Sequence, residues 1–537
     1  MSNNEIVQKL WNLCDVLRDD GINYSDYVTE LVLLLFFKME YEQAQSEVIF
    51  DHKLPEGYRW PDLSSKSGLN LLNEYKRMLL TLSTGKDIQP DPDDETKTIE
   101  KIVVTDPLIL AIYAEAQTRL REPRHLEQLI KQLDKIDWFS AKRDGLGDLY
   151  EGLLEKNASE TKSGAGQYFT PRPLIDSIIR CIQPQAGETI QDPAAGTAGF
   201  LIAADSYIKS QTDDLYTLNE KDRTFQKTRA FVGMELVPGT RRLALMNCLL
   251  HGMEGSDEGV VLLGNTLGLP GSRLPTANVI LTNPPFGTAK GGGGPTRDFT
   301  HKTSNKQLAF LQHIYGSLKP GGRAAVVLPD NVLFEAGVGS DIRRDLMHKC
   351  NLHTILRLPT GIFYAQGVKT NVLFFTRGTV EKPRQEENCT SNVWVYDLRT
   401  NMPSFGKRTP FGEQYLKPFE AVYGEEPNGT SPRSEGEWSF CAEVTEQNAE
   451  NSRWRCFSRE YIRDQKGDSL DISWIKDEDS VDAASLPDPD VLAAEAMGEL
   501  TEALRELDSL MQTLGAGDLA VAQRALLVEA LGLEGEE

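Results

Sequence analysis

Residues Gln191–Phe200 read QDPAAGTAGF and directly follow a short β-rich run, Thr189–Gln191. Glycines at 196 and 199 let the backbone approach a ligand closely, and the helix expected after them offers free N–H groups in its first turn. Many such turns serve only packing. The dinucleotide spacing GxGxxG and the phosphate loop GxxxxGK[ST] are both absent, so any ligand here is expected to be neither NAD nor ATP.

Further β-rich runs follow this stretch and alternate with helical ones. That alternation is typical of a parallel sheet with helices on both faces, in which ligands bind beyond the carboxyl ends of the strands. The expected strands are Thr189–Gln191, Ala230–Met234, Val260–Leu263, Asn278–Thr282, Ala324–Leu328, His353–Leu358 and Asn371–Phe375. We therefore expect an α/β fold whose chemistry lies at the strand ends.

The rest of the chain has a different pattern. Apolar residues at helical spacing predict a helical domain over residues 1–160, interrupted by the irregular stretch Asp87–Glu95. We expect the α/β domain over 161–400, an acidic loop-rich extension over 401–485, and a helical tail over 486–537. Within the tail, a heptad seam with 3-4-3-4-3 spacing is formed by Met497, Leu500, Leu504, Leu507, Met511 and Leu514.

The formal net charge of −23 is distributed unevenly over the 537 residues. Residues 381–537 carry a net charge of −18, and the other 380 residues carry only −5. Such a chain would not bind DNA tightly through phosphate contacts alone. For any role on nucleic acid, we expect a basic partner that holds the DNA.

Targeting and cysteine patterns point to an intracellular protein. No apolar run approaches the ~20 residues needed to span a bilayer, and the first residues, MSNNEIVQ, lack a basic region followed by an apolar one. We therefore expect a cytoplasmic protein with no membrane segment. The seven cysteines have no ligand spacing such as CxxC, so we expect buried, reduced thiols and no metal site.

Glu235 ends the expected strand FVGME at residues 231–235. A carboxylate at this place can accept two hydrogen bonds from the hydroxyls of a ribose. It lies 43 residues after Asp192, about twice the usual spacing of ~20, and the polar insertion Asp213–Gln226 accounts for the excess. Taken alone, Glu235 also fits a solvated acid at a strand end.

Asn283–Phe286 (NPPF) follows another expected strand. Pro284 and Pro285 stiffen the turn and remove N–H donors, so the Asn283 side-chain oxygen and the Pro284 carbonyl can accept both hydrogens of an exocyclic amine. Holding adenine N6, a poor nucleophile, in line with a sulfonium methyl group favours methyl transfer. Phe286 offers a face on which a flipped base can stack. No cysteine follows a proline, which disfavours methylation at cytosine C5.

These motifs carry a family resemblance. The chain resembles the amino-methyltransferases of DNA and closely resembles, over essentially its whole length, the methylation subunits of enteric type I restriction-modification systems, IA family. The most specific run is Lys162–Pro173 (KSGAGQYFTPRP), which in the family closes over the methionine part of S-adenosylmethionine. The order of the motifs is that of the gamma class. The resemblance implies a Rossmann-like S-adenosylmethionine-dependent methyltransferase sheet, with an N-terminal all-helical domain and a C-terminal helical tail.

Residue by residue, the resemblance implies two functional sets. The cofactor would be contacted by Gln167, Tyr168, Phe169, Thr170, Pro171, Arg172, Asp192, Gly196, Thr197, Ala198, Gly199, Glu235 and Asn265. Catalysis and base stacking would involve Asn283, Pro284, Pro285, Phe286 and Phe363. Asn265 would meet the adenine edge of the cofactor, where related enzymes often have Asp. Phe363, which bare sequence logic places in the core, would be the second aromatic residue beside the flipped base.

No basic reading domain follows NPPF, and the resemblance accordingly implies a separate specificity subunit. It also implies two methylation subunits for each specificity subunit, double-stranded DNA as the substrate, and a restriction and translocase subunit in the full complex. Two alternatives remain: amino-methylation of RNA or of protein glutamine, and a catalytically silent assembly or DNA-clamping subunit. The helical N-terminal domain, QYFTP and the heptad seam disfavour the first, and the intact NPPF and QYFTP motifs disfavour the second.

Overall fold

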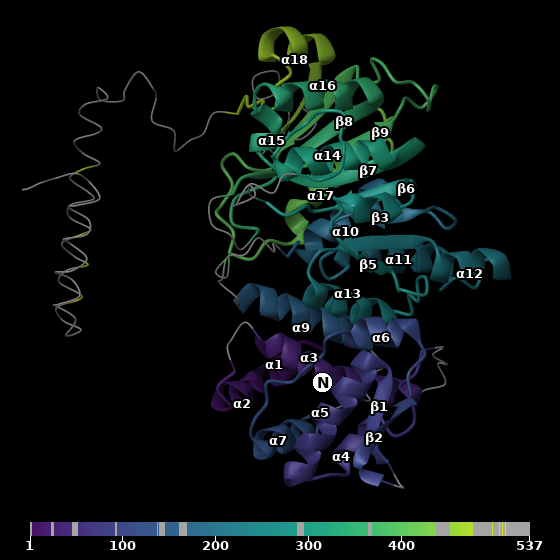
Figure 1. The fold of residues 1–537 in the computed structure, drawn as a ribbon. Helices are drawn as coiled ribbons and strands as arrows, with labels where there is room; N and C mark the ends of the chain where they lie inside the picture. Colours follow the sequence, from purple (N-terminus) through teal and green to yellow (C-terminus); the bar gives the residue numbers. More distant parts are fainter. Residues whose placement is uncertain are drawn as a thin grey trace, which may run out of the picture. The chain divides into compact units, whose positions relative to one another are not determined.

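The computed structural model describes residues 3–22, 26–45, 52–91, 94–136, 138, 145–160, 169–286, 295–363, 368–406, 409–435 and 452–475, together with Met497, Leu504, Leu507 and Met511. The chain forms two compact units, Met1–Ile475 and Lys476–Glu537. The first unit holds all the named helices and strands (Figure 1). Among the described residues, no helix is long and apolar enough to cross a membrane.

A nine-stranded sheet forms the centre of the first unit, in the order β11-β10-β8-β9-β7-β6-β3-β4-β5. The strands are β3 Ile190–Asp192, β4 Phe231–Glu235, β5 Val261–Leu263, β6 Ala277–Thr282, β7 Leu318–Pro329, β8 Cys350–Arg357, β9 Thr370–Arg377, β10 Asn392–Asp397 and β11 Trp454–Ser458. Strands β3 to β7 pair in parallel with one another. Each expected strand overlaps one of these, so the predicted α/β fold is confirmed.

The expectation of an entirely parallel sheet was wrong. β9 runs antiparallel to both of its neighbours, β7 and β8. The described part of 358–369, which joins β8 to β9, contains no helix, whereas a parallel pair needs a crossover that is usually helical. The sheet also extends beyond the expected strands, because β10 pairs with β8 and β11 pairs with β10.

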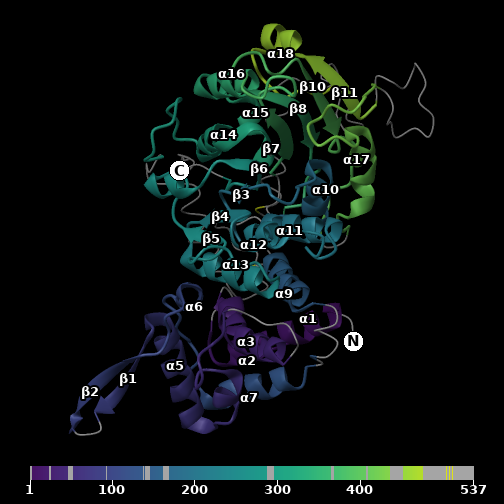
Figure 2. The same ribbon diagram turned by 90° about the vertical axis from the view of Figure 1, so that its right-hand side faces the viewer.

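Helices cover both faces of the sheet (Figure 1 and Figure 2). One face carries α10 Arg172–Ile182, α11 Gly199–Gln211, α13 Pro238–Leu250 and α17 Lys417–Tyr423, and the other carries α14 Lys306–Ser317, α16 Val338–Lys349 and α18 Arg459–Lys466. Val279 and Leu281 enter the first core, whereas Ile280 between them enters the second. With both faces buried, β6 is almost continuously apolar, which made it visible in the sequence. Shorter elements are α12 Glu220–Thr228, α15 Asn331–Phe334, η2 Leu269–Arg273 and η3 Glu413–Tyr415.

The described part of the N-terminal domain contains helices and the hairpin of β1 and β2. Its helices are α1 Asn3–Asn12, α2 Cys14–Asp19, α3 Tyr27–Ala44, α4 Trp60–Ser64, α5 Gly68–Thr84, α6 Pro107–Tyr113, α7 Pro123–Asp134 and α9 Leu146–Glu160. The described residues of the stretch expected to be irregular lie in an antiparallel pair, β1 Lys86–Asp91 with β2 Asp94–Ile102. This hairpin projects from the helices (Figure 2), and a two-stranded ribbon tolerates Pro90 because each strand has a free edge. The prediction of an irregular stretch was therefore wrong.

Helix α9 connects this domain to the sheet by packing against α1 and α13. Near its start, Asp148 and Glu151 lie about one helical turn apart and face His251, which follows α13. Nε2 of His251 lies 3.7 Å from Oδ1 of Asp148, and the Asn247 carbonyl lies 2.9 Å from the other ring nitrogen. Burial alone would lower the pKa of His251, but Asp148 and Glu151 outweigh burial and raise it above 6.5.

We expect this contact to weaken as the pH rises. A raised folded-state pKa stabilises the fold fully below the unfolded value of about 6.5, and that stabilisation is lost as the pH passes the folded value. His251→Gln should therefore lower the melting temperature more at about pH 6 than at about pH 8.5. Asp148→Asn should shrink this difference. Equal destabilisation of the His251 variant at both pH values would contradict the assignment.

Candidate active site

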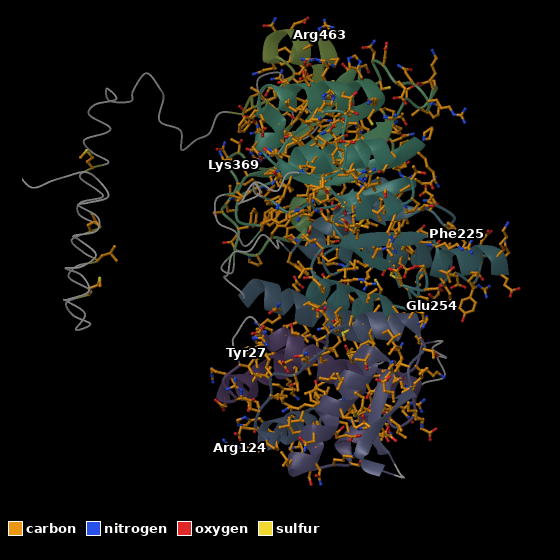
Figure 3. All side chains as sticks on the ribbon, in the orientation of Figure 1. Tyr27, Arg124, Phe225, Glu254, Lys369 and Arg463 are labelled. Atoms are coloured by element: carbon orange, nitrogen blue, oxygen red, sulfur yellow. The ribbon has the colours of Figure 1, made fainter. Side chains whose placement is uncertain are left out.

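The parallel strands bring polar residues together at one edge of the sheet. Asp192 ends β3, Glu235 ends β4, Asn283 follows β6 and Asp330 follows β7. Lys369, at the start of the reversed strand β9, marks the same edge, because its carbonyl accepts a hydrogen bond from the Asp330 N–H at 3.0 Å. Figure 3 labels Lys369 on one side of the sheet, and Phe225 and Glu254 on the opposite side. The edge near Lys369 is therefore the carboxyl edge, where the fold predicts the chemistry.

The turn after β3 is tied to the end of β4. The Gly196 N–H donates to Oε2 of Glu235 at 3.1 Å, and the Val237 N–H donates to Oε1 at 2.8 Å. Gly196 and Ala198 have positive φ angles of 55° and 70°, and α11 begins directly afterwards. The first turn of α11 therefore presents N–H groups beside a fixed carboxylate, an arrangement that suits a polar ligand.

Other residues support the turn after β3 with hydrogen bonds. The Asn247 side chain donates to the carbonyl of Thr197 at 3.1 Å, and Oδ1 of Asp192 accepts the Ala194 N–H at 3.0 Å. Burial raises the pKa of Asp192 to about 7, and burial also raises the pKa of Glu235. Asn265, just after β5, uses its side-chain oxygen to accept the Leu267 N–H at 3.0 Å.

These residues fit the nucleoside part of S-adenosylmethionine. Glu235 holds its carboxylate at the strand end with backbone bonds, which leaves acceptor positions for ribose hydroxyls. Gly199 begins the helix at the end of the turn, and a Cβ there would lie 3.3 Å from the Cδ1 atom of Ile175, a tight contact. The structure thus brings together the expected residues Asp192, Gly196–Gly199 and Glu235.

Asn283 presents a buried acceptor. Its Nδ2 donates to Oγ1 of Thr170 at 3.0 Å. Its Oδ1 is buried and has no hydrogen-bond partner among the described residues. A buried amide oxygen without a donor is costly, so this atom is suited to accept an N–H from a ligand. Thr170, which the sequence assigned to the cofactor, here orients the amide of Asn283.

The two aromatic residues of the expected site also meet. The rings of Phe286 and Phe363 have centroids 6.0 Å apart and lie edge to face, with an angle of 77° between their planes. Phe363 is buried and Phe286 is partly exposed. A base between two parallel ring faces needs a separation of about 7 Å, twice a van der Waals contact distance. The rings must therefore turn and separate before a base can lie between them.

The remaining expected residues have mixed outcomes. Gln167 and Tyr168 lie outside the described residues, whereas Phe169 and Pro171 lie just before α10. Arg172 forms ion pairs with Glu151 of α9 and with Asp176, the latter at 3.1 Å. The described structure therefore engages Arg172 with α9 and α10.

Sequence reasoning missed several polar residues of the same edge. Gln307 of α14 donates to the carbonyl of Pro285 at 3.3 Å, which supports the NPPF turn. Asp330 accepts two hydrogen bonds from Arg399, at 2.8 and 2.9 Å. The available signal was that PDN (329–331) and YDLR (396–399) each come at the end of a β-rich run.

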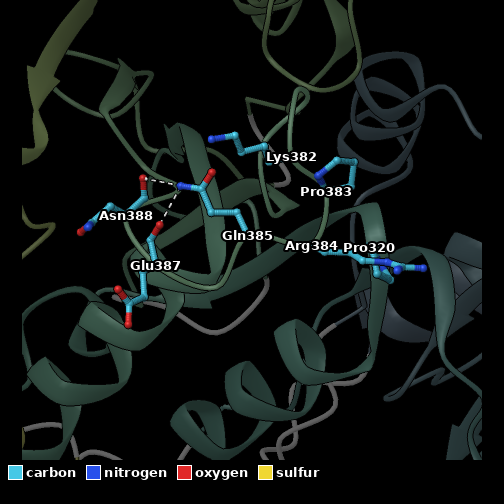
Figure 4. A pocket seen from close by; sticks show the side chains of 7 residues that line it. All are labelled: Pro320, Lys382, Pro383, Arg384, Gln385, Glu387 and Asn388. Atoms are coloured by element: carbon cyan, nitrogen blue, oxygen red, sulfur yellow. Dashed lines mark hydrogen bonds between the residues drawn. The ribbon is translucent and has the colours of Figure 1, made fainter.

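A surface hollow elsewhere is distinct from this site. It has a volume of about 890 Å³ and is lined by Pro320, Lys382, Pro383, Arg384, Gln385, Glu387 and Asn388 (Figure 4). Pro320 lies near the amino end of β7, and the other residues belong to the connection from β9 to β10. The hollow is therefore at the opposite edge of the sheet from Asn283.

Comparison with known proteins identifies the family. Residues 141–468 match the model of N-6 DNA methylases, and residues 486–529 match that of the C-terminal domain of type I restriction enzyme methylase subunits. The chain is 60% identical to the StySJI methylase subunit of Salmonella typhimurium and to the EcoKI methylase subunit of Escherichia coli, over 99% of each chain.

Solved structures agree with these matches. The crystal structure of the EcoKI M protein superposes with a TM-score of 0.57 at 55% identity, covering 98% of this chain and 99% of that one. A chain from a study of the assembly and conformational transition of a type I restriction-modification system gives 0.65 at 26% identity, covering 96% and 99%.

These findings confirm the family resemblance, the Rossmann-like methyltransferase fold and S-adenosylmethionine as the methyl donor. They do not favour a silent subunit or an enzyme acting on RNA or glutamine. The chain therefore belongs to the N-6 DNA methylase family, within which it is the methylase subunit of a type I restriction enzyme and an adenine-N6-specific DNA methyltransferase.

Proposed function

We propose that Asn283, with the Pro284 carbonyl, holds the N6 amino group of a flipped adenine during methyl transfer. The observation that carries the proposal is the buried Oδ1 of Asn283, which lacks a donor among the described residues while Nδ2 is held by Thr170. An oxygen fixed in this way can accept one N6 hydrogen without reorganising. The Pro284 carbonyl is the expected acceptor for the other hydrogen.

When bound, S-adenosylmethionine supplies the electrophilic methyl group. The chain contributes position and charge complementarity: accepting both N6 hydrogens orients the lone pair of the nitrogen toward the methyl carbon. Gln167 to Arg172, Asp192, Gly196–Gly199, Glu235 and Asn265 are proposed to hold the cofactor. Phe286 and Phe363 are proposed to stack on the two faces of the flipped base.

For assembly, we propose that the terminal segment docks this chain on a specificity subunit. Met497, Leu504 and Leu507 lie on the heptad seam and are 69%, 45% and 56% exposed. The negative charge concentrated in residues 381–537 fits a basic partner that contacts the DNA. The proposed complex has two copies of this chain flanking one specificity subunit on double-stranded DNA, and a restriction subunit joins it in the full enzyme.

We also propose that the chain is divided into four functional regions. A helical domain over 1–160, a catalytic domain over 161–400, an extension over 401–485 and a docking tail over 486–537 would give each region one role. The cytoplasm, where the chromosome is accessible, is the proposed location. The alternative for the tail is that its seam folds back on its own acidic region.

Asn283→Ala should abolish methyl transfer to DNA adenine in the complex while changing S-adenosylmethionine binding by only a few-fold. The lost hydrogen bonds matter mainly in the transition state, so the rate should fall much more than the affinity. Asn283→Asp keeps one acceptor oxygen and should retain more activity than the alanine variant. Transfer of labelled methyl groups to unmethylated DNA measures the effect, and normal turnover by Asn283→Ala would remove this residue from the mechanism.

Glu235→Ala should weaken S-adenosylmethionine binding by ~1–3 kcal/mol, because the ribose hydroxyls lose a charged acceptor. Glu235→Gln, which keeps one acceptor oxygen, should lose less. Calorimetry with the purified chain measures both affinities. If the alanine variant binds as tightly as the wild type, the ribose must be held elsewhere.

Deletion of residues from Leu486 onward should abolish co-purification with the specificity subunit and leave cofactor binding intact. The charge-introducing pair Leu504→Asp and Leu507→Asp should have the same effect, because both residues lie on the seam. Glu502→Ala, a heptad position away from the seam, is the matched control. A truncated chain that still forms the complex would favour the fold-back alternative.

A further inference from the structure

Arg399 lies at the carboxyl edge of the sheet, two residues beyond the end of β10, with a side chain that is only 8% exposed. Its guanidinium donates to both carboxylate oxygens of Asp330, at 2.8 and 2.9 Å. It also donates to the carbonyl of Leu358 at 3.0 Å, to that of Thr370 at 2.7 Å, and to the side-chain oxygen of Asn371 at 3.2 Å. One buried cation therefore joins the end of β7, the chain after β8 and the start of β9.

The carboxylate partner of Arg399 is fixed independently. Nδ2 of Asn371 donates to Oδ1 of Asp330 at 2.7 Å. Burial would raise the pKa of Asp330, but the guanidinium of Arg399 outweighs burial and lowers it. The pair is therefore ionised at neutral pH, and a planar guanidinium is well suited to bind a carboxylate and two carbonyls at once.

Arg399 is itself held by the end of β10. The backbone N–H groups of Arg399 and Thr400 both donate to Oδ1 of Asp397 at 2.8 Å. Asp397 is fully buried, and the carbonyl of Thr400 accepts a hydrogen bond from Arg453 at 2.8 Å. The backbone that carries the Arg399 side chain is thus fixed by hydrogen bonds.

The segment that Arg399 holds leads to Phe363. Leu358 begins the turn that contains this phenylalanine, and its N–H donates to the carbonyl of Thr370 at 3.0 Å. Further along the turn, the Phe405 N–H donates to the carbonyl of Thr360 at 3.1 Å. A Cβ on Gly361, whose φ is 84°, would lie 2.0 Å from the Phe405 carbonyl oxygen, so the turn is closely packed.

We propose that Arg399, through its contacts with Asp330 and the Leu358 carbonyl, is the positioning residue that sets the place of Phe363 beside the flipped adenine. The inference rests on the proposed stacking role of Phe363. Arg399 acts on the reaction through the turn, since it touches the Asp330 carboxylate, the side-chain oxygen of Asn371 and backbone atoms. Loss of Arg399 should displace the ring of Phe363. A displacement of about 1 Å from the reacting geometry slows catalysis by up to a hundredfold.

The chain offers a matched control at the opposite edge of the sheet. Arg323 of β7 is also buried, donates to both oxygens of Glu188 at 2.7 and 2.9 Å, and donates to the carbonyls of Ile182 and Gln183 at 2.7 and 2.8 Å. Each of these arginines binds one carboxylate and two backbone carbonyls. Arg323→Lys and Arg399→Lys therefore remove the same kind of guanidinium contact at two different places. Both should lower the melting temperature.

The test measures amide hydrogen exchange of a peptide covering 358–363 and the single-turnover rate of methyl transfer in the complex with the specificity subunit. Arg399→Lys should speed exchange in this peptide and slow methyl transfer between tenfold and a hundredfold, with S-adenosylmethionine affinity within twofold of the wild type. Arg323→Lys should change neither quantity by more than twofold. Asp330→Asn, which keeps the shape of the partner, should give a smaller change in the same direction as Arg399→Lys.

Two results would overturn the inference. One is unchanged exchange over 358–363 in both Arg399→Lys and Asp330→Asn; the other is faster exchange with an unchanged transfer rate. Phe363→Ala separates the two proposals, because a normal rate in that variant would remove the stacking role. The exchange measurement still reports whether Arg399 holds the turn, whatever Phe363 does.

Discussion

The direction of the strands is the constraint on which the rest of the structure depends. Because β3 to β7 run parallel, every connection that leaves a carboxyl end emerges at the same edge of the sheet. Glu235 and Asn283, which are 48 residues apart in the sequence, come to the same edge for this reason, with β3 between their strands. The reversed strand β9 adds to the effect, since the connection that enters it brings the turn with Phe363 to the same edge.

Gathering polar groups at one edge creates a second requirement, because each buried donor and acceptor must find a partner. The structure meets it across strands: Gly196 bonds Glu235, Thr170 bonds Asn283, and Arg399 bonds Asp330. Each bond fixes one loop against its neighbour and so holds the site in shape before a ligand arrives. Oδ1 of Asn283 is one of the buried atoms that have no hydrogen-bond partner among the described residues, and it lies at the carboxyl edge directly after β6.

Sequence patterns predicted the elements buried on both faces and failed where an element is exposed or is defined by distant pairing. β6 is an almost continuous apolar run, and the predicted strand Asn278–Thr282 differs from the observed Ala277–Thr282 by one residue at its start. The hairpin of β1 and β2 contains Pro90 and many acids, so its strands gave no apolar signal. β10 lies among acidic loops, and only its pairing with β8 makes it part of the sheet.

In the candidate site, too, local sequence indicated some features, and others depend on contacts between distant residues. Two motifs with a chemical reason for their composition, NPPF and the turn after β3, were singled out from local sequence alone, and the structure places both at the carboxyl edge. The partnership of Thr170 with Asn283 and that of Arg399 with Asp330 span 113 and 69 residues, so no local pattern could indicate them. Arg172 was assigned from the motif around it, whereas its charge is engaged by Glu151, a residue of the preceding helix.

The closed pair of Phe286 and Phe363 is compatible with base entry on energetic grounds. An edge-to-face contact contributes ~0.5–1.5 kcal/mol in addition to the effect of burying its apolar surface. This additional contribution is lost when the rings separate. Stacking a base on an aromatic side chain contributes ~1–3 kcal/mol, so two ring faces more than offset the separation and part of the cost of unpairing the base. In the proposed reaction, the edge-to-face contact between the rings is replaced by contacts of each ring with the base.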